Sequence, residues 1–270
     1  MSEEVDDEVL KFEREQKAER DRQKRERALL NATKPIHDSL YGNVTPEIIN
    51  EISSRQRKLM KKGDHASLTY SEVPYQGMFK VIGQLHRLGL DEGSEGTFVD
   101  LGSGVGNLVY GSLLAHDFNV VVGIEILSDL HDIACEVHEL WDSEVRRPLP
   151  LKKQETVVKL VRGDCCYIDW SYGDVVFSNS TCFDSATMER LATLACDLKP
   201  LAFFVCISNK LPPSIVEPYM DLLQTSSLET SWGTASTYIY RRNQKPGSTT
   251  ISDRDSFVQD LVYFKEIRKN

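Results

Sequence analysis

The chain has 270 residues, of which 41 are acidic and 32 basic, so its formal net charge at pH 7 is −9. Hydrophobic residues make up 40% and charged residues 27%, which is typical of a soluble protein. This acidic balance argues against a protein that coats nucleic acid with its whole surface, although local basic patches remain compatible with it. No apolar run approaches the ~18 residues that a membrane-spanning helix needs, so we expect no membrane association.

The lack of a secretory signal and the spacing of the cysteines indicate a reducing compartment, the cytosol or the nucleus. The residues after Met1 lack an apolar secretory segment, and residue 2 is not the glycine that myristoylation requires. None of the six cysteines forms a CxxC pair. We therefore expect neither a disulfide framework nor a metal site.

The N-terminal residues are predicted to form a charged helical arm over residues 1–34. Residues 3–27 hold ten acidic and eight basic side chains with no glycine or proline, and this composition favours a solvated helix. Pro35 and the Gly42-Asn43 turn signal are expected to end this segment. A second helix should begin at Pro46 and continue to about Lys62.

The end of this second helix is the densest positive patch of the chain. Helix capping accounts for two or three of its cations, and the rest make the patch a candidate surface for an anionic partner. The five basic residues are Arg55, Arg57, Lys58, Lys61 and Lys62.

From residue 64 onward, apolar strands alternate with amphipathic helices, which predicts an α/β fold with a mostly parallel sheet covered on both faces. We expect residues 35–95 to form a helical N-terminal region, and residues 96–270 to form the core. Strands are predicted at 97–101, 119–124, 157–161, 175–177, 203–207, 237–241 and 257–264, the last two without a helix between them. Helices are predicted at 77–90, from 106, at 129–141 and at 184–198.

A glycine-rich turn follows the first strong strand. Gly102, Gly104 and Gly106 have the spacing GxGxG, and Asp100 precedes them at the strand end. Glycines in such a turn let the backbone approach a ligand closely. This spacing is one residue short of the dinucleotide fingerprint, so we favour S-adenosylmethionine over a nicotinamide dinucleotide.

Two further acids end the next two strands. Glu125 suits the two ribose hydroxyls of an adenosine, and Asp164 ends the strand after it. Carboxyl ends of parallel strands are where open α/β sheets bind ligands. The alternative is that the glycines only make a tight turn and the acids only cap helices.

These segments resemble the Dot1-type (disruptor of telomeric silencing) histone methyltransferases, and in particular the compact versions from trypanosomatids. Residues 98–106 resemble the cofactor loop of that family, and the resemblance extends over about residues 68–264. Further segments match the family in the same order along the chain: residues 70–75, 162–164, 176–183, 208–210, 231–232 and 237–238.

The resemblance implies a class I, Rossmann-like fold of seven strands that binds S-adenosylmethionine. It implies that Glu125 binds the ribose hydroxyls, that Asp164 accepts from the adenine amino group and that the Cys165 backbone faces the ring. The methionine and ribose portion is expected to contact Asp100, Gly102, Gly104 and Asn107, covered by Tyr70, Glu72 and Val73. The methyl group and the substrate amine are expected to meet at Asn179, beside a channel walled by Phe183, Trp232 and Tyr238.

Four departures from the family pattern leave the width of this channel, and the number of methyl groups transferred, open. Ser71 replaces a glycine, Ser180-Thr181 replaces Asn-Phe, and Cys165 stands where an aromatic residue is frequent. The interval from Trp232 to Tyr238 is also one residue shorter than expected.

The resemblance implies transfer of a methyl group to a lysine in the globular core of histone H3 on the nucleosome, in the nucleus, with S-adenosylhomocysteine as product. Weak, salt-sensitive DNA contact is expected through the patch at residues 55–62 and then through residues 20–27. Alternatives are a class I methyltransferase acting on RNA, a small molecule or a non-histone protein, and a non-catalytic adaptor with a methyltransferase-like fold.

Overall fold

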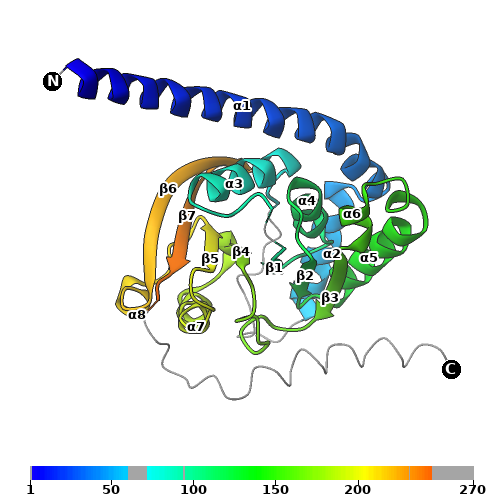
Figure 1. The fold of residues 1–270 in the computed structure, drawn as a ribbon. Helices are drawn as coiled ribbons and strands as arrows, with labels where there is room; N and C mark the ends of the chain where they lie inside the picture. The colour runs from blue at the N-terminus through cyan, green and yellow to red at the C-terminus, as the bar shows by residue number, and fades with distance from the viewer. Residues whose placement is uncertain (1, 60–71, 94, 231, 245–270) are drawn as a thin grey trace.

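The computed structural model describes residues 2–59, 72–93, 95–230 and 232–244. Its centre is a sheet of seven strands in the order β3-β2-β1-β4-β5-β7-β6 (Figure 1). The five strands from β3 to β5 run parallel, whereas β7 is antiparallel to both of its neighbours. The strands are β1 Thr97–Leu101, β2 Val120–Glu125, β3 Val157–Arg162, β4 Val175–Asn179, β5 Phe203–Ile207, β6 Met220–Thr230 and β7 Gly233–Arg242.

Helices cover both faces of this sheet, because successive strand residues point to opposite sides and both sides are apolar. Phe98, Phe177 and Val205 pack on one side with the helices α3 and α4. Val99 and Val176 pack on the other side with α7. The helices are α1 Ser2–Leu40, α2 Pro46–Leu59, α3 Tyr75–Arg87, α4 Asn107–Ala115, α5 Ser128–Leu140, α6 Leu151–Glu155, α7 Ser185–Ala195 and α8 Pro213–Val216, with short turns of helix at η1 Trp141–Val145 and η2 Ser180–Cys182.

The structure confirms the predicted α/β class and the seven-strand sheet. Strands β1 and β5 have the predicted bounds, and α2 begins at Pro46 as predicted. All six cysteines are free thiols in the structure. None of the helices in the described part of the chain is long and apolar enough to cross a membrane.

The first helix is longer than predicted, because it continues through Pro35 to Leu40. A proline inside a helix removes one backbone hydrogen bond and disfavours the helix. Here the turn after Pro35 packs on the core: Leu40 is buried, and the His37 ring contacts the backbone oxygen of Asn107 at 3.2 Å. Tertiary packing therefore overrides the local signal, and the helix ends only at the turn around Gly42.

The antiparallel edge of the sheet is formed by β7 and β6, and β6 is missing from the sequence prediction. A register shift between Leu222 and Gln224 breaks the alternation of apolar and polar residues that marks a strand. The predicted strand 257–264 lies outside the described residues.

Candidate cofactor site and active site

Four polar residues lie at the ends of four neighbouring strands. Asp100, Glu125 and Asn179 are in β1, β2 and β4, and Asp164 follows the end of β3 by two residues. These strands are parallel neighbours in the sheet, so their carboxyl ends share one edge (Figure 1). The structure therefore brings these predicted site residues to one edge of the sheet, as the sequence analysis expected.

The glycine turn between β1 and α4 needs its glycines. Gly102, Gly104 and Gly106 have φ angles of 79°, 54° and 83°, a region that side chains with a Cβ disfavour. A Cβ on Gly102 would lie 3.6 Å from the Phe183 ring, so the predicted channel residue Phe183 is next to the turn. The turn is held to β2, since the amides of residues 102 and 103 donate to the Ile124 oxygen at 2.8 and 3.0 Å.

Glu125 is buried, and the backbone fixes its carboxylate. One carboxylate oxygen accepts from the Gly104 amide at 2.7 Å, and the other accepts from the Leu127 amide at 2.7 Å. The backbone amide of Ile126 also contributes a hydrogen bond. A carboxylate has about four acceptor sites, so the Glu125 carboxylate can still accept from a ligand hydroxyl. Burial raises the pKa of Glu125, while these amide hydrogen bonds act in the opposite direction.

Asp100 is a buried acid beside Glu125. Burial, and then the charge of Glu125, raise the pKa of Asp100 to about 8. Among the described residues, no donor hydrogen-bonds to the Asp100 side chain and no cation pairs with it. Two neighbouring buried carboxyl groups without a cation fit a positively charged ligand group, which would favour their ionised forms.

Asp164 and Cys165 lie in a tight turn after β3. The Asp164 carboxylate accepts from the Cys166 amide at 2.8 Å, and the Trp170 indole donates to the Cys165 oxygen at 2.9 Å. A hydrogen bond with Cys166 and burial raise the pKa of Cys165, and the charges of Asp164 and Glu125 add to this effect, so this turn lies close to the ribose-binding candidate. Within the described residues, Asp164, Cys165 and Cys166 are the one group with donor atoms close enough to hold a metal ion, within 4.8 Å of one another.

Glu72 and Asn107 meet above the glycine turn. The Asn107 amide nitrogen donates to the Glu72 carboxylate, while the Asn107 side-chain oxygen is buried and has no hydrogen-bond partner among the described residues. A buried acceptor without a donor is costly, so this oxygen fits a donor group on a ligand. Val73 is fully buried, and Tyr70 lies outside the described residues.

One residue of α1 and one in the turn after it also support the glycine turn, and no sequence pattern singles out either residue. His37 contacts the backbone oxygen of Asn107, and the Tyr41 hydroxyl donates to the Val105 oxygen at 3.4 Å. Burial lowers the pKa of His37, which favours its neutral form. A cavity of about 400 Å³ adjoins this contact, and both side chains line it together with Glu72, Tyr75 and Asn107.

Asn179 lies at the start of a polar turn between β4 and α7. Its side-chain oxygen accepts from the Thr181 hydroxyl at 2.8 Å, and the hydroxyls of Thr181 and Ser208 lie 2.8 Å apart. Asn179 could be identified from the sequence, whereas Thr181 and Ser208 could not be assigned a role. A polar residue two positions after a strand-end asparagine is too common a pattern to single out.

The three predicted channel aromatics are not equally placed. Phe183 and Tyr238 are half-buried and pack against the same core cluster. Trp232 lies in the turn between β6 and β7 with 39% of its surface exposed, and no ring contact among the described residues includes it. The structure therefore does not unite Trp232 with the other two in one wall.

Comparison with known proteins places the chain in a family. The family model described as "Histone methylation protein DOT1" matches residues 48–217, which is more than half of the chain. The chain belongs to the DOT1 family of histone methylation proteins. The predicted class I methyltransferase fold and the predicted cofactor, S-adenosylmethionine, are thereby confirmed. The matched segment runs from α2 to α8 and contains every strand end described above.

Other comparisons add little. No curated protein matches the sequence. An RNA methyltransferase from Salinibacter ruber in complex with S-adenosyl-L-homocysteine is 21% identical, with a TM-score of 0.43 over 63% of this chain and 95% of that chain. The magnesium protoporphyrin IX methyltransferase of Synechocystis PCC 6803 with bound SAM is 14% identical, with a TM-score of 0.48 over 80% of this chain and 95% of that chain. With TM-scores below 0.5, these likenesses carry no argument here.

Proposed function

We propose that the protein is a histone-lysine N-methyltransferase of the nucleus that modifies a lysine in the globular core of histone H3 on the nucleosome. The membership in the DOT1 family supports the histone substrate. The observation that carries the proposal is the pair of buried carboxyl groups, Asp100 and Glu125, beside the glycine turn and at the same edge of the sheet as Asn179. S-adenosylmethionine supplies the electrophilic methyl group when it is bound, and S-adenosylhomocysteine is the product.

The cofactor-binding roles divide along this edge of the sheet. Glu125 accepts from the ribose hydroxyls with the lone pairs that its backbone contacts leave available. Asp100 receives the positive charge of the methionine portion, and Asp164 accepts from the adenine amino group beside Cys165. The glycine turn and the covering segment complete the site, through Tyr70, Glu72, Val73, Gly102, Gly104 and Asn107.

The substrate end of the site works by positioning and by exclusion of water. An amine must be neutral to attack, and apolar surroundings disfavour its charged form. Asn179 cannot act as a general base, so its carboxamide orients the amine by hydrogen bonding. Phe183 and Tyr238 form the apolar wall next to it. Alignment without a catalytic base suits an in-line displacement at a sulfonium.

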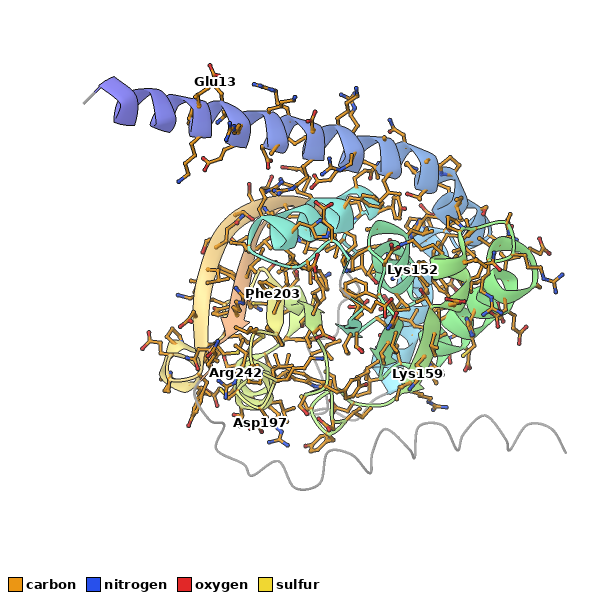
Figure 2. All side chains as sticks on the ribbon, viewed as in Figure 1. Glu13, Lys152, Lys159, Asp197, Phe203 and Arg242 are labelled. Carbon is orange, nitrogen blue, oxygen red and sulfur yellow. The ribbon has the colours of Figure 1, made fainter. Side chains whose placement is uncertain are left out.

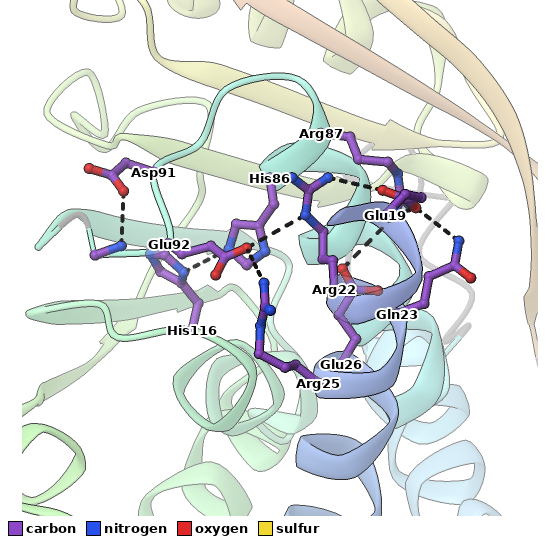
Figure 3. A network of polar contacts seen from close by, with 11 residues as sticks. Glu19, Arg22, Gln23, Arg25, Glu26, His86, Arg87, Asp91, Glu92 and His116 are labelled. Carbon is purple, nitrogen blue, oxygen red and sulfur yellow. Dashed lines mark hydrogen bonds and ion pairs between the residues drawn. The ribbon is translucent and has the colours of Figure 1, made fainter. Parts of the chain in front are cut away.

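For contact with the nucleosome, the structure divides the predicted basic residues into two groups. Arg22 and Arg25 face Glu92 at 3.6 and 3.8 Å and hold α1 on the core (Figure 3), and Arg55 pairs with Asp129 at 2.8 Å. The second group is exposed and, within the described residues, makes no ion pair: Arg20, Lys24 and Arg27.

Arg20, Lys24 and Arg27 follow one another at helical spacing, so they share one face of α1. We propose that this face contacts DNA phosphates, together with Arg57, Lys58, Lys61 and Lys62, whose side chains lie outside the described residues. Glu13, nearer to the N-terminus of the same helix, points away from the sheet, and its negative charge opposes binding of phosphates (Figure 2). The contact should therefore be weak and salt-dependent.

Incubation with radiolabelled S-adenosylmethionine and separate samples of nucleosomes, free histones and RNA tests this function. We expect label in histone H3 and more of it with nucleosomes than with free histones. Label only in RNA would end the histone proposal. Absence of cofactor binding at millimolar concentration, measured by calorimetry, would instead indicate a non-catalytic adaptor.

A further inference from the structure

Two turns at the ends of β4 and β5 are tied together by side chains. The Ser180 hydroxyl donates to the Ile207 oxygen at 2.7 Å, and the Asn209 amide donates to the Ser180 oxygen at 2.6 Å. A further hydrogen bond joins the Asn209 amide to the Phe183 oxygen at 3.3 Å. Each of these hydrogen bonds ends on a backbone carbonyl, so Ser180 and Asn209 hold the path of the main chain.

Thr181, the residue after Ser180, makes a different kind of contact. Its hydroxyl bonds two side chains, the Asn179 carboxamide at 2.8 Å and the Ser208 hydroxyl at 2.8 Å. The carboxamide oxygen can only accept, so the single Thr181 hydrogen points to Asn179 and the Ser208 hydroxyl donates to Thr181. The direction of the whole chain of hydrogen bonds, from Ser208 through Thr181 to Asn179, is thereby set.

Ser208 is held in an uncommon conformation that supports this chain. Its φ angle is 70°, in the left-handed region that residues other than glycine rarely adopt. The Ser208 amide donates to the Ser236 oxygen at 2.7 Å, which ties the turn to β7. Such a conformation persists where the surrounding structure determines it, and here it directs a hydroxyl at Thr181.

We infer that Thr181 is a positioning residue that sets the orientation of the Asn179 carboxamide at the point of methyl transfer. A carboxamide turns as one unit, so a hydrogen bond to its oxygen also fixes where its nitrogen points. Loss of the Thr181 hydroxyl removes a hydrogen bond that favours this orientation. In the reversed orientation, a donor stands where the substrate amine needs an acceptor. This inference rests on the proposed role of Asn179.

The test compares Thr181→Val, which keeps the shape and removes the hydroxyl, with Thr181→Ser, which restores it. Thr193→Val is the matched control, because that hydroxyl donates to the Glu189 oxygen at 2.9 Å within α7. Two quantities are measured for each variant: kcat and KM on nucleosomes, and the affinity for sinefungin divided by that for S-adenosylhomocysteine. Sinefungin carries an amine at the position of the transferred methyl group, so this ratio needs no turnover.

We expect Thr181→Val to lower kcat and the affinity ratio by about 3- to 10-fold, the effect of one lost hydrogen bond, with KM and the S-adenosylhomocysteine affinity unchanged. Thr181→Ser and Thr193→Val should match the parent protein. In an Asn179→Ala background, Thr181→Val should have no further effect, because its role passes through Asn179.

Three results would overturn the inference. Thr181→Val could match the parent in both quantities, its effect could persist in the Asn179→Ala background, or Thr193→Val could reproduce it. A parent protein that binds neither sinefungin nor S-adenosylhomocysteine would refute the proposed function itself. If the parent binds both and Asn179→Ala changes nothing, the assignment of Asn179 fails, and the role of Thr181 fails with it.

Discussion

Charged side chains are buried in two different ways in this molecule. Lys153 and Arg242 lie at the ends of helices, where the protein supplies all the acceptors they need. The Lys153 ammonium donates to the oxygens of Leu113 and His116 at 2.6 and 2.8 Å and pairs with Asp117 at 2.8 Å. These oxygens belong to the end of α4, where the helix dipole favours a cation.

The Arg242 side chain is also buried, and it lies at the end of α7 (Figure 2). Its guanidinium donates to the Cys196 oxygen at 2.8 Å and to the Asn243 oxygen at 2.8 Å, and it lies over the Tyr219 ring. At the glycine turn, by contrast, Asp100 and Glu125 are buried together and no cation among the described residues reaches Asp100. Charges that serve the fold are therefore compensated within the chain, whereas the buried acids of the cofactor site await a ligand.

Removal of a compensated charge should have the largest effect on stability. We expect Arg242→Met to lower the free energy of unfolding by about 3 kcal/mol, because several buried carbonyl groups lose a charged donor. The affinity of the folded protein for S-adenosylmethionine should not change. Urea unfolding and calorimetry measure the two quantities, with Arg241→Met, on the other face of β7, as control. An equal loss of unfolding free energy in both variants would contradict the claim that the buried contacts of Arg242 stabilise the fold.

Removal of a cofactor-site carboxylate should instead weaken cofactor binding. Glu125→Ala should weaken S-adenosylmethionine binding by about 2 kcal/mol, as expected for a buried acceptor of ligand hydroxyls. Glu125→Gln, which keeps one acceptor oxygen, should lose less. Calorimetric titration of both variants checks this order, and an unchanged affinity in Glu125→Ala would count against the ribose assignment.

The pH dependence of stability should report the uncompensated acid. The pKa of Asp100 is raised to about 8 in the folded protein, so the native state keeps a proton that the unfolded chain loses near pH 4. The free energy of unfolding is therefore highest below about pH 4. As pH rises from there to about 8, Asp100 lowers it by about 1.4 kcal/mol per pH unit. Asp100→Asn removes this loss. In urea titrations between pH 5 and pH 8, the stability of the variant should therefore rise relative to that of the parent protein by the same amount per pH unit. Parallel pH profiles would show that Asp100 is ionised in the free protein.

Exposed charges should matter least. Glu92, half-exposed, faces Arg22 and Arg25 where α1 lies on the core (Figure 3). Glu92→Gln should cost about 0.5 kcal/mol or less and should matter less still in high salt. A loss as large as that of Arg242→Met would mean that this surface network, and not the buried carbonyl contacts, secures the molecule.

The strand ends of the site could be predicted because the physics that places them is local. Buried parallel strands are continuous apolar runs, and their carboxyl ends meet at one edge, so Asp100, Glu125 and Asp164 follow from the strand assignments. Asn179 was singled out only by the resemblance to the family. The glycine turn could be predicted because only glycine adopts its backbone angles without strain.

The supporting contacts could not be predicted, since they join residues that are far apart in the sequence. His37 and Asn107 are separated by 70 positions, and Thr181 and Ser208 by 27. Strand β6 was missed because its register shift hides the alternating pattern. The helix end at Pro35 was wrong because burial of Leu40 outweighs the local cost of a proline.

The most direct test of the central claim is proton release on cofactor binding. If a cationic cofactor ionises Asp100, then binding of S-adenosylmethionine at pH 7 should expel close to one proton from the parent protein and none from Asp100→Asn. Calorimetry in two buffers of different ionisation enthalpy measures this number. Binding without proton release in the parent protein would contradict the claim that these buried acids await a positive charge.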